Sequence, residues 1–415
     1  IINTEPMHRI FTLLHMGTNN KHIIVFLKNK LISLDSILPL ALEINRCCGY
    51  RFYFIIWQYE SYKSVVEDNI VLRDMALSVG QIICPNTSSK NNIKAKFKKF
   101  FMLAGVVYKL HFKKSHIFHF GALDEYPLVF LTKLINKNKI ARCESSFTGR
   151  YTDDLMYQMG LNDEDDRNSI LQHRSSHNLL ERYIGGSYPV NNSGILIGFD
   201  SDWNWFKHPN AKYCKKLVLN EGRNVKGYFD FISKNSDNYL NQENLLNLGK
   251  DKTILVILGH FGDGSEMTEY RNRLLYEALT VLRNLDLNIV IKPHVFCDMN
   301  LVKSIVKKAR CEESNRIYYT RIHPHMLQKI SMGGLFINNS TVRCDYKSTN
   351  FPVITYNGGF SDKVVFDNCS GIICSDRKML TSSLELLIQE SSTNILKGRE
   401  VSVKGCTKIK KTISC

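Results

Sequence analysis

TILVIL at Thr253–Leu258, followed by GHFGDG at 259–264, is the stretch of this sequence that decides the fold. A continuous apolar run of this length predicts a buried strand, and the glycines after it predict a tight loop. Residues 266–284 then place apolar side chains at helical spacing. The stretch therefore predicts a strand, a loop and a helix in succession, which is the unit from which parallel sheets are built.

The same order of elements recurs on both sides of this stretch. In the second half, strands are predicted at 288–292, 317–320, 334–337 and 353–356, and helices at 299–310 and 324–331. In the first half, strands are predicted at 22–27, 51–57, 117–120, 139–143 and 194–199, and helices at 34–45 and 128–135. Strands that alternate with helices predict an α/β protein with two Rossmann-like doubly wound domains.

We expect an N-terminal domain at 1–245, a C-terminal domain at 246–390 and a basic tail at 391–415. The polar, Asn-rich sequence between 216 and 249 is expected to connect the two domains.

Composition narrows the classes of protein that remain. Of the 415 residues, 44% are hydrophobic and 23% charged, which excludes a disordered or collagen-like chain. Lys and Arg exceed Asp and Glu by 55 to 39, which favours anionic partners such as nucleic acid, lipid headgroups or phosphorylated substrates. The twelve cysteines form no C-x-x-C pair, which argues against zinc modules and redox centres.

Basic, small and flexible residues follow four consecutive predicted strands of the second half. In chain order they are His260, Gly262 and Gly264, then Lys292 and His294, then Arg321, His323 and His325, and finally Asn339, Ser340 and Thr341. The carboxyl ends of parallel strands meet at one edge of a sheet, so these residues predict a site that binds phosphate. Each residue also has a structural alternative: a tight turn for the glycines, a helix start for the histidines and an N-cap for the hydroxyls.

Four motifs follow the glycine loop in the second half: IKPH at 291–294, HPHML at 323–327, FINNST at 336–341 and NFPVI at 350–354. Together they are similar to the nucleotide-sugar domain of GT-B glycosyltransferases. The similarity is to bacterial capsule, lipopolysaccharide and teichoic-acid transferases, including the CDP-glycerol, sialyl- and polysialyltransferases. It implies two domains facing a central cleft, with the H-P motif and the Ser/Thr-rich loop holding the donor phosphates.

We therefore expect a glycosyltransferase that moves a sugar or polyol phosphate from a nucleotide-activated donor to a surface glycan in polysaccharide biosynthesis. Since Lys and His can neutralise a diphosphate, we expect no metal and no cofactor besides the donor substrate. Two alternatives remain. One is an enzyme like UDP-N-acetylglucosamine 2-epimerase, which would need a tight acidic cluster that the sequence does not show. The other is a basic scaffold that binds nucleic acid.

The first half supplies candidates for the acceptor side. Glu144 and Glu125 are candidates, in that order, for the base that accepts a proton from the acceptor hydroxyl. Arg142 and Arg150 are candidates for binding the acceptor. The sialyltransferases carry an acidic pair followed by Gly, whereas Tyr126 follows Glu125 in this sequence. The alternative for each carboxylate is a surface position or an ion pair with Arg142 or Arg150.

A basic segment begins at Ile93 and ends at Lys114. It contains seven lysines and interleaved aromatic residues, which favours contact with an anionic membrane surface. Single-stranded nucleic acid and an ordinary solvated helix are the alternatives. Because no RNA or DNA module is recognisable, no nucleic-acid partner is expected. No apolar run is long enough to span a bilayer and no signal peptide is recognisable, so we expect a cytoplasmic protein, peripheral at the inner face of the cytoplasmic membrane.

Overall fold

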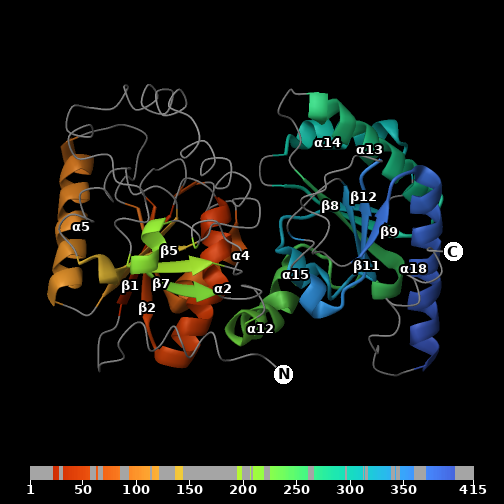
Figure 1. The fold of residues 1–415 in the computed structure, drawn as a ribbon. Helices are drawn as coiled ribbons and strands as arrows, with labels where there is room; N and C mark the ends of the chain where they lie inside the picture. Colours follow the sequence, from red (N-terminus) through yellow and green to blue (C-terminus); the bar gives the residue numbers. More distant parts are fainter. Residues whose placement is uncertain are drawn as a thin grey trace. The chain divides into compact units, whose positions relative to one another are not determined.

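The computed structural model describes two compact units, Ile1–Phe231 and Ile232–Cys415 (Figure 1). The residues it describes are 22–27, 31–56, 62–63, 69–84, 93–112, 115–120, 136–143, 194–198, 206, 209–218, 225–259, 266–294, 297–311, 313, 316–337, 342, 346–358 and 371–397.

The first unit is built on a seven-stranded parallel sheet with the order β3-β2-β1-β4-β5-β6-β7. Its strands are β1 (His22–Leu27), β2 (Arg51–Ile56), β3 (Gly80–Ile83), β4 (His116–Phe120), β5 (Ile140–Cys143), β6 (Ile195–Gly198) and β7 (Lys215–Val218). The order runs outward in both directions from β1 and β4, which pair in parallel register. This is the doubly wound topology that the sequence predicts.

Helices cover both faces of this sheet (Figure 1). The helix α5 (Ile93–Phe112) buries Leu103 and Val106 against a cluster that contains Ile24, Ile117 and Ile140 from the central strands. The helices α2 (Leu31–Cys48) and α4 (Ile70–Val79) lie on the opposite side. Burial on both faces explains why the central strands are nearly continuous apolar runs.

The second unit is built on a six-stranded parallel sheet with the order β10-β9-β8-β11-β12-β13. Its strands are β8 (Thr253–Leu258), β9 (Asn288–Lys292), β10 (Ile317–Tyr319), β11 (Gly333–Ile337), β12 (Val353–Tyr356) and β13 (Ile372–Cys374). Every residue of β8 and β11 is buried, as the TILVIL run predicts. The strand order again reverses direction at neighbouring central strands, here β8 and β11.

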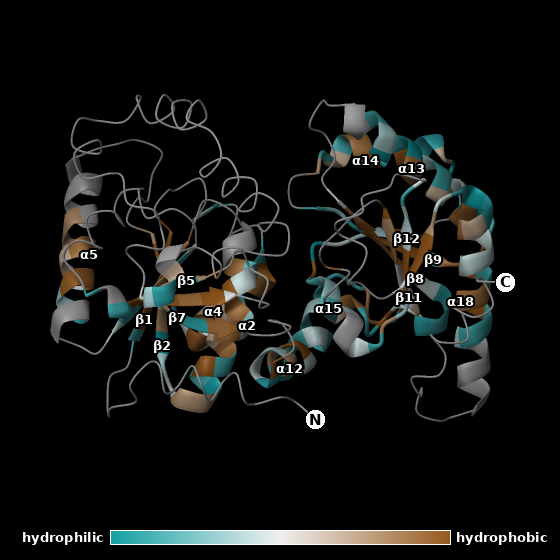
Figure 2. Ribbon diagram, viewed as in Figure 1, coloured by the Kyte–Doolittle hydropathy of each residue, from teal (hydrophilic) through white to brown (hydrophobic). Residues whose placement is uncertain are grey.

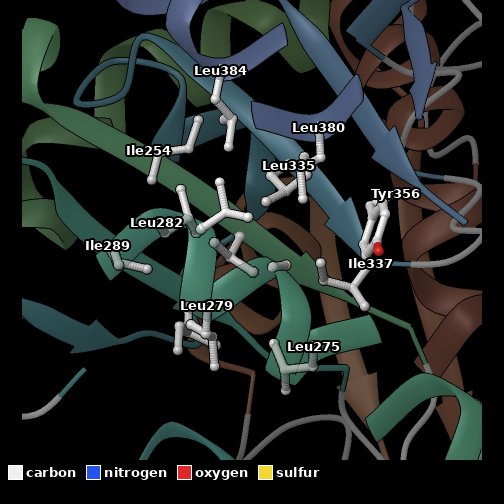
Figure 3. Close-up of a cluster of buried hydrophobic side chains, with 14 of the residues drawn as sticks. Ile254, Leu275, Leu279, Leu282, Ile289, Leu335, Ile337, Tyr356, Leu380 and Leu384 are labelled. Carbon is white, nitrogen blue, oxygen red and sulfur yellow. The ribbon is translucent and has the colours of Figure 1, made fainter. Parts of the chain in front are cut away.

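Three helices close one face of the second sheet: α13 (Glu266–Arg283), α14 (Met299–Lys308) and α18 (Arg377–Lys397). Figure 3 shows the core that they form with the strands, drawn with Ile254, Ile289, Leu335 and Ile337 of the sheet, Leu275, Leu279 and Leu282 of α13, and Leu380 and Leu384 of α18. In Figure 2 the strands are mostly hydrophobic, while α13 and α18 carry many hydrophilic residues. The core therefore lies between the sheet and these helices.

The polar sequence at 216–249, expected to be a connection, contains regular structure. It includes most of β7 and the whole of α12 (Lys226–Gln242). Although α12 is rich in Asn, it buries Tyr228, Ile232 and Leu240, which share one helical face. The division between the two compact units falls within this helix.

The first turn of α12 is tied to α2 by a buried carboxylate. Glu43, 5% exposed, accepts a hydrogen bond of 2.6 Å from the backbone N–H of Gly227 and is also paired with Arg46. A carboxylate at this end of α12 also complements the helix dipole. Burial opposes ionisation of Glu43, but the bonds from Arg46 and Gly227 outweigh it and leave its pKa below the ordinary value. A Cβ on Gly227 would lie 2.9 Å from the Leu42 carbonyl carbon, so the backbones touch.

Candidate functional site

The carboxyl ends of β9 and β10 lie side by side in the second sheet. The strands pair in parallel with Ile291 opposite Tyr319, and the Thr320 N–H donates to the Ile291 carbonyl at 3.0 Å. Lys292 ends β9, and Arg321 follows β10 by two residues. This pairing brings two cationic side chains, predicted separately from the sequence, to the same edge of the sheet.

The turn after β9 is held against the turn after β8. The Cys297 N–H donates to the His294 carbonyl at 3.0 Å, and the Cys297 thiol donates to the Gly259 carbonyl at 3.2 Å. Lys292 is half-buried and donates to the Pro293 carbonyl at 3.1 Å, while His294 is also half-buried. A half-buried ammonium and imidazole on a braced turn can approach an anionic ligand without a large loss of conformational entropy.

His323 and His325 are buried, at 7% and 5% exposure, at the start of the short helix α15 (Pro324–Leu327). Their rings stack with centroids 5.3 Å apart and planes 10° from parallel. Nδ1 of His323 accepts from the backbone N–H of His325 at 3.4 Å. In the neutral ring, Nδ1 as acceptor leaves the proton on Nε2, which can therefore donate to an anion.

An aromatic cluster supports the two imidazoles. Tyr346, fully buried, lies 5.4 Å from the His325 ring, and its own ring contacts Phe336 and Phe351 at 5.9 and 4.9 Å. The helix-start alternative for the histidines thus holds locally, because His323 caps α15 and His325 belongs to the core. Capping through Nδ1 is compatible with ligand binding through Nε2.

Residues that the sequence patterns did not indicate fix the carboxyl end of β12. The Tyr270 hydroxyl on α13 donates to the Asn357 carbonyl, and the Tyr356 hydroxyl donates to the Glu277 carboxylate. Burial and the nearby carboxylate together raise the pKa of Tyr356, so its hydroxyl stays protonated. Tyr270 and Glu277 lie within α13, 12 and 19 residues along the chain from the end of β8, where no strand-end signal in the sequence could reveal them.

Arg142 is the described candidate on the acceptor side, and it lies inside the first sheet. It is 2% exposed in β5, directly beside His119 of β4, which is fully buried. Both residues share the face that α5 covers, since each stands two positions after an isoleucine of that cluster. Burial raises the pKa of the neighbouring Cys143 thiol, which disfavours a nucleophilic thiolate there.

The remaining candidates lie outside the described residues: Glu125, Glu144, Arg150, His260, Gly262, Gly264, Asn339, Ser340 and Thr341. Their roles stay predictions. Within the ranges that the structure describes, no group of three or more His, Cys, Asp or Glu side chains could hold a metal ion.

No protein-family profile matches the sequence. A search of curated proteins gives no match either.

Solved structures do share the fold. The UDP-GlcNAc 2-epimerase from Methanocaldococcus jannaschii superposes with a TM-score of 0.51 at 13% identity, over 89% of this chain and 93% of that one. The epimerase from Neisseria meningitidis, bound to UDP-GlcNAc, gives a TM-score of 0.50 at 12% identity, over 90% and 92%. A glycosyltransferase from Rickettsia africae gives 0.47 at 11% identity, over 95% and 98%. The predicted fold class is confirmed: the chain is an α/β protein of the GT-B type, with two Rossmann-like units.

Proposed function

We propose that this chain is a nucleotide-sugar enzyme, a glycosyltransferase that moves a sugar or polyol phosphate from an activated donor to a surface-glycan acceptor. The observation that carries the proposal is the convergence of Lys292, His294, Arg321 and His323 at the adjacent carboxyl ends of β9 and β10. Open α/β sheets bind ligands at this edge. The two UDP-GlcNAc 2-epimerases with the same fold, one of them bound to UDP-GlcNAc, support a nucleotide sugar as the ligand class.

The donor diphosphate would be neutralised by protein cations. Lys292 and Arg321 form charge-assisted hydrogen bonds to phosphate oxygens, and Nε2 of His323 donates a further bond. As the bond between the sugar and the nucleotide breaks, negative charge grows on the leaving phosphate. The same groups stabilise that charge, so they lower the barrier as well as binding the donor.

The acceptor hydroxyl must lose a proton as it attacks the donor. Glu144, or else Glu125, serves as the general base in this proposal. Arg150 binds the acceptor in this proposal, whereas Arg142, 2% exposed, acts as a fixed cation within the sheet and not through direct contact. No metal ion takes part in the proposed reaction, because lysine and histidine side chains supply the positive charge that the donor diphosphate requires.

Mass spectrometry with CMP-, CDP-, UDP- and GDP-linked donors tests this proposal. A transferase releases the nucleotide and adds the mass of the sugar or polyol phosphate to an added glycan acceptor. We expect one donor class to be consumed, with turnover unchanged when a chelator is present.

The same experiment distinguishes the alternatives. A 2-epimerase would return a stereoisomer of the donor, and in deuterium oxide that product would gain one deuterium at the sugar carbon that loses its proton. A nucleic-acid scaffold would leave every donor intact and bind oligonucleotides with a steep salt dependence. Either result would overturn transferase activity.

A further inference from the structure

The outward side of α5 carries an exposed aromatic stripe. Phe100, Phe101 and Tyr108 are 65%, 68% and 54% exposed, and Ala104 between them is exposed as well. Positions 100, 104 and 108 lie on one side of a helix because they are spaced four residues apart. The opposite side of α5 buries Leu103 and Val106 against the sheet. The stripe is thus separate from the packing that holds α5 in place.

Exposure of two adjacent phenylalanines is uncommon on a soluble surface and marks a contact site when the residues form a patch. The rings of Phe100 and Phe101 touch each other edge to face, with centroids 5.8 Å apart and planes at 74°. Hydrophobic residues are visible along the described part of α5 in Figure 2. A partner that binds this side of α5 must therefore present apolar groups to the exposed rings.

The same segment is strongly basic. Residues 93–114 contain seven lysines and no Asp or Glu. Lys109 is drawn back onto the sheet, with Nζ 4.6 Å from the centroid of the Tyr53 ring. Four other lysines, at positions 94, 96, 98 and 99, directly precede the phenylalanines in the sequence. The partner must therefore combine apolar groups with negative charge.

We propose that α5 docks on the surface of an anionic lipid bilayer. Lysines bind the headgroups, and Phe100 and Phe101 enter the boundary between headgroups and acyl chains. This contact needs no spanning segment, and no described helix is long and apolar enough to cross a membrane.

Two other occupants fit less well. A second copy of the chain would place two acid-free lysine segments opposite each other, which is repulsive. Single-stranded nucleic acid binds in a basic groove with bases stacked on successive ring faces. Here the stripe stands on the convex side of a helix, and one ring presents its edge to the other.

Sedimentation of the full chain with vesicles tests the proposal. The vesicles contain phosphatidylcholine with about 30% phosphatidylglycerol, and pure phosphatidylcholine vesicles serve as the neutral comparison. We expect the double variant Phe100→Ser/Phe101→Ser to lower the bound fraction at least about fivefold, because one signal alone gives marginal membrane binding. The matched control is Leu77→Ser/Tyr213→Ser, which removes two similarly exposed residues elsewhere and should bind as the parent does.

A second pair of variants separates local charge from total charge. Changing Lys94, Lys96, Lys98 and Lys99 to Gln should abolish binding. The control changes four lysines outside α5, Lys234, Lys250, Lys252 and Lys378, to Gln, and it alters the net charge equally.

Three results would overturn the proposal. The first is equal loss in both lysine variants, since binding would then follow total charge. The second is unchanged binding in the phenylalanine variant. The third is a parent chain that binds a single-stranded oligonucleotide but not the anionic vesicles.

Discussion

The backbone N–H of His325 donates to Nδ1 of His323, so in the neutral His323 ring the proton lies on Nε2. Because the His323 ring stacks on the His325 ring, which in turn contacts Tyr346, the orientation of both imidazoles is set before a ligand arrives. A preset donor binds an anion with little additional ordering cost.

Replacing His323 with Ala should weaken binding of the donor nucleotide by about 1–3 kcal/mol, the range for a charge-assisted or buried hydrogen bond. Isothermal titration calorimetry with the nucleoside diphosphate measures this loss. His323→Asn is the control, because Asn keeps an N-cap for α15 but lacks the imidazole donor. If Asn restores full affinity, the ring acts only as a cap.

Replacing Ser340 with Ala should weaken nucleotide binding within the same range of about 1–3 kcal/mol, because the loop at 338–341 is expected to hold phosphate. Full affinity in both the His323 and the Ser340 variants, with folding intact, would remove this edge of the sheet from the proposed function.

Replacing Glu144 with Gln should lower turnover at least ~100-fold, because Gln cannot accept the proton of the acceptor hydroxyl. Nucleotide affinity should stay unchanged, since the residue acts on the acceptor. Steady-state kinetics and calorimetry measure the two effects separately. Glu125→Gln is the companion variant. Full activity in Glu144→Gln together with loss of activity in Glu125→Gln would assign the general base to Glu125.

Replacing Glu43 with Gln should destabilise the first unit by about 1–2 kcal/mol near pH 7, because a charged acceptor for Gly227 and Arg46 becomes neutral. The pKa of Glu43 is lowered on folding, so its carboxylate stabilises the protein above the ordinary pKa of 4.5. That stabilisation is lost as the pH falls through the folded pKa. The difference between parent and variant should therefore shrink at acidic pH.

Urea unfolding followed by tryptophan fluorescence measures this difference. All three tryptophans, at positions 57, 203 and 205, lie in the first unit, so the signal reports on that unit. If the parent and Glu43→Gln differ in free energy of unfolding by the same amount at about pH 7 and pH 4, the negative charge of Glu43 does not stabilise the first unit.

Replacing Gly227 with Ala should destabilise the first unit by about 1–3 kcal/mol, because the new methyl group would press on the backbone of α2. Gly105→Ala in α5 is the matched control. A Cβ at position 105 would meet no atom within 4 Å, so Ala there should stabilise the helix by about 0.5–1 kcal/mol. Opposite signs in the same urea assay are expected. Stabilisation in both variants would show that α12 can move away from α2.

The sequence predicts the central strands well and the edges of the sheets poorly. Runs such as Thr253–Leu258 are buried on both faces, so they are apolar throughout and stand out from their surroundings. The strands that the patterns do not reveal are β3, β7 and β13, and all three lie at an edge of a sheet. Lys215 and Lys216 of β7 are exposed. Charged side chains on an edge strand keep its unpaired backbone groups from pairing with another chain, so such a strand is not an apolar run.

For the candidate site, the sequence predicts which residues follow strand ends but not what surrounds them. Lys292 ends β9 and His323 follows β10. Because these two strands are adjacent and parallel, the turns after them lie at the same edge of the sheet. The contact of His325 with Tyr346 depends on a segment about twenty residues away, which no local pattern connects to it. Asn-rich composition likewise concealed α12, whose helical character rests on a few buried side chains.

The bond between Glu43 and Gly227 joins positions 184 residues apart, and this separation bears on how the protein is made. A ribosome releases the chain from the N-terminus, so α2 emerges long before its partner on α12. Until then the Glu43 carboxylate lacks the amide that satisfies it, and the edge strand β7 has only just become available to complete the sheet. Folding of the first unit during translation should therefore finish only after the first turn of α12 has left the exit tunnel.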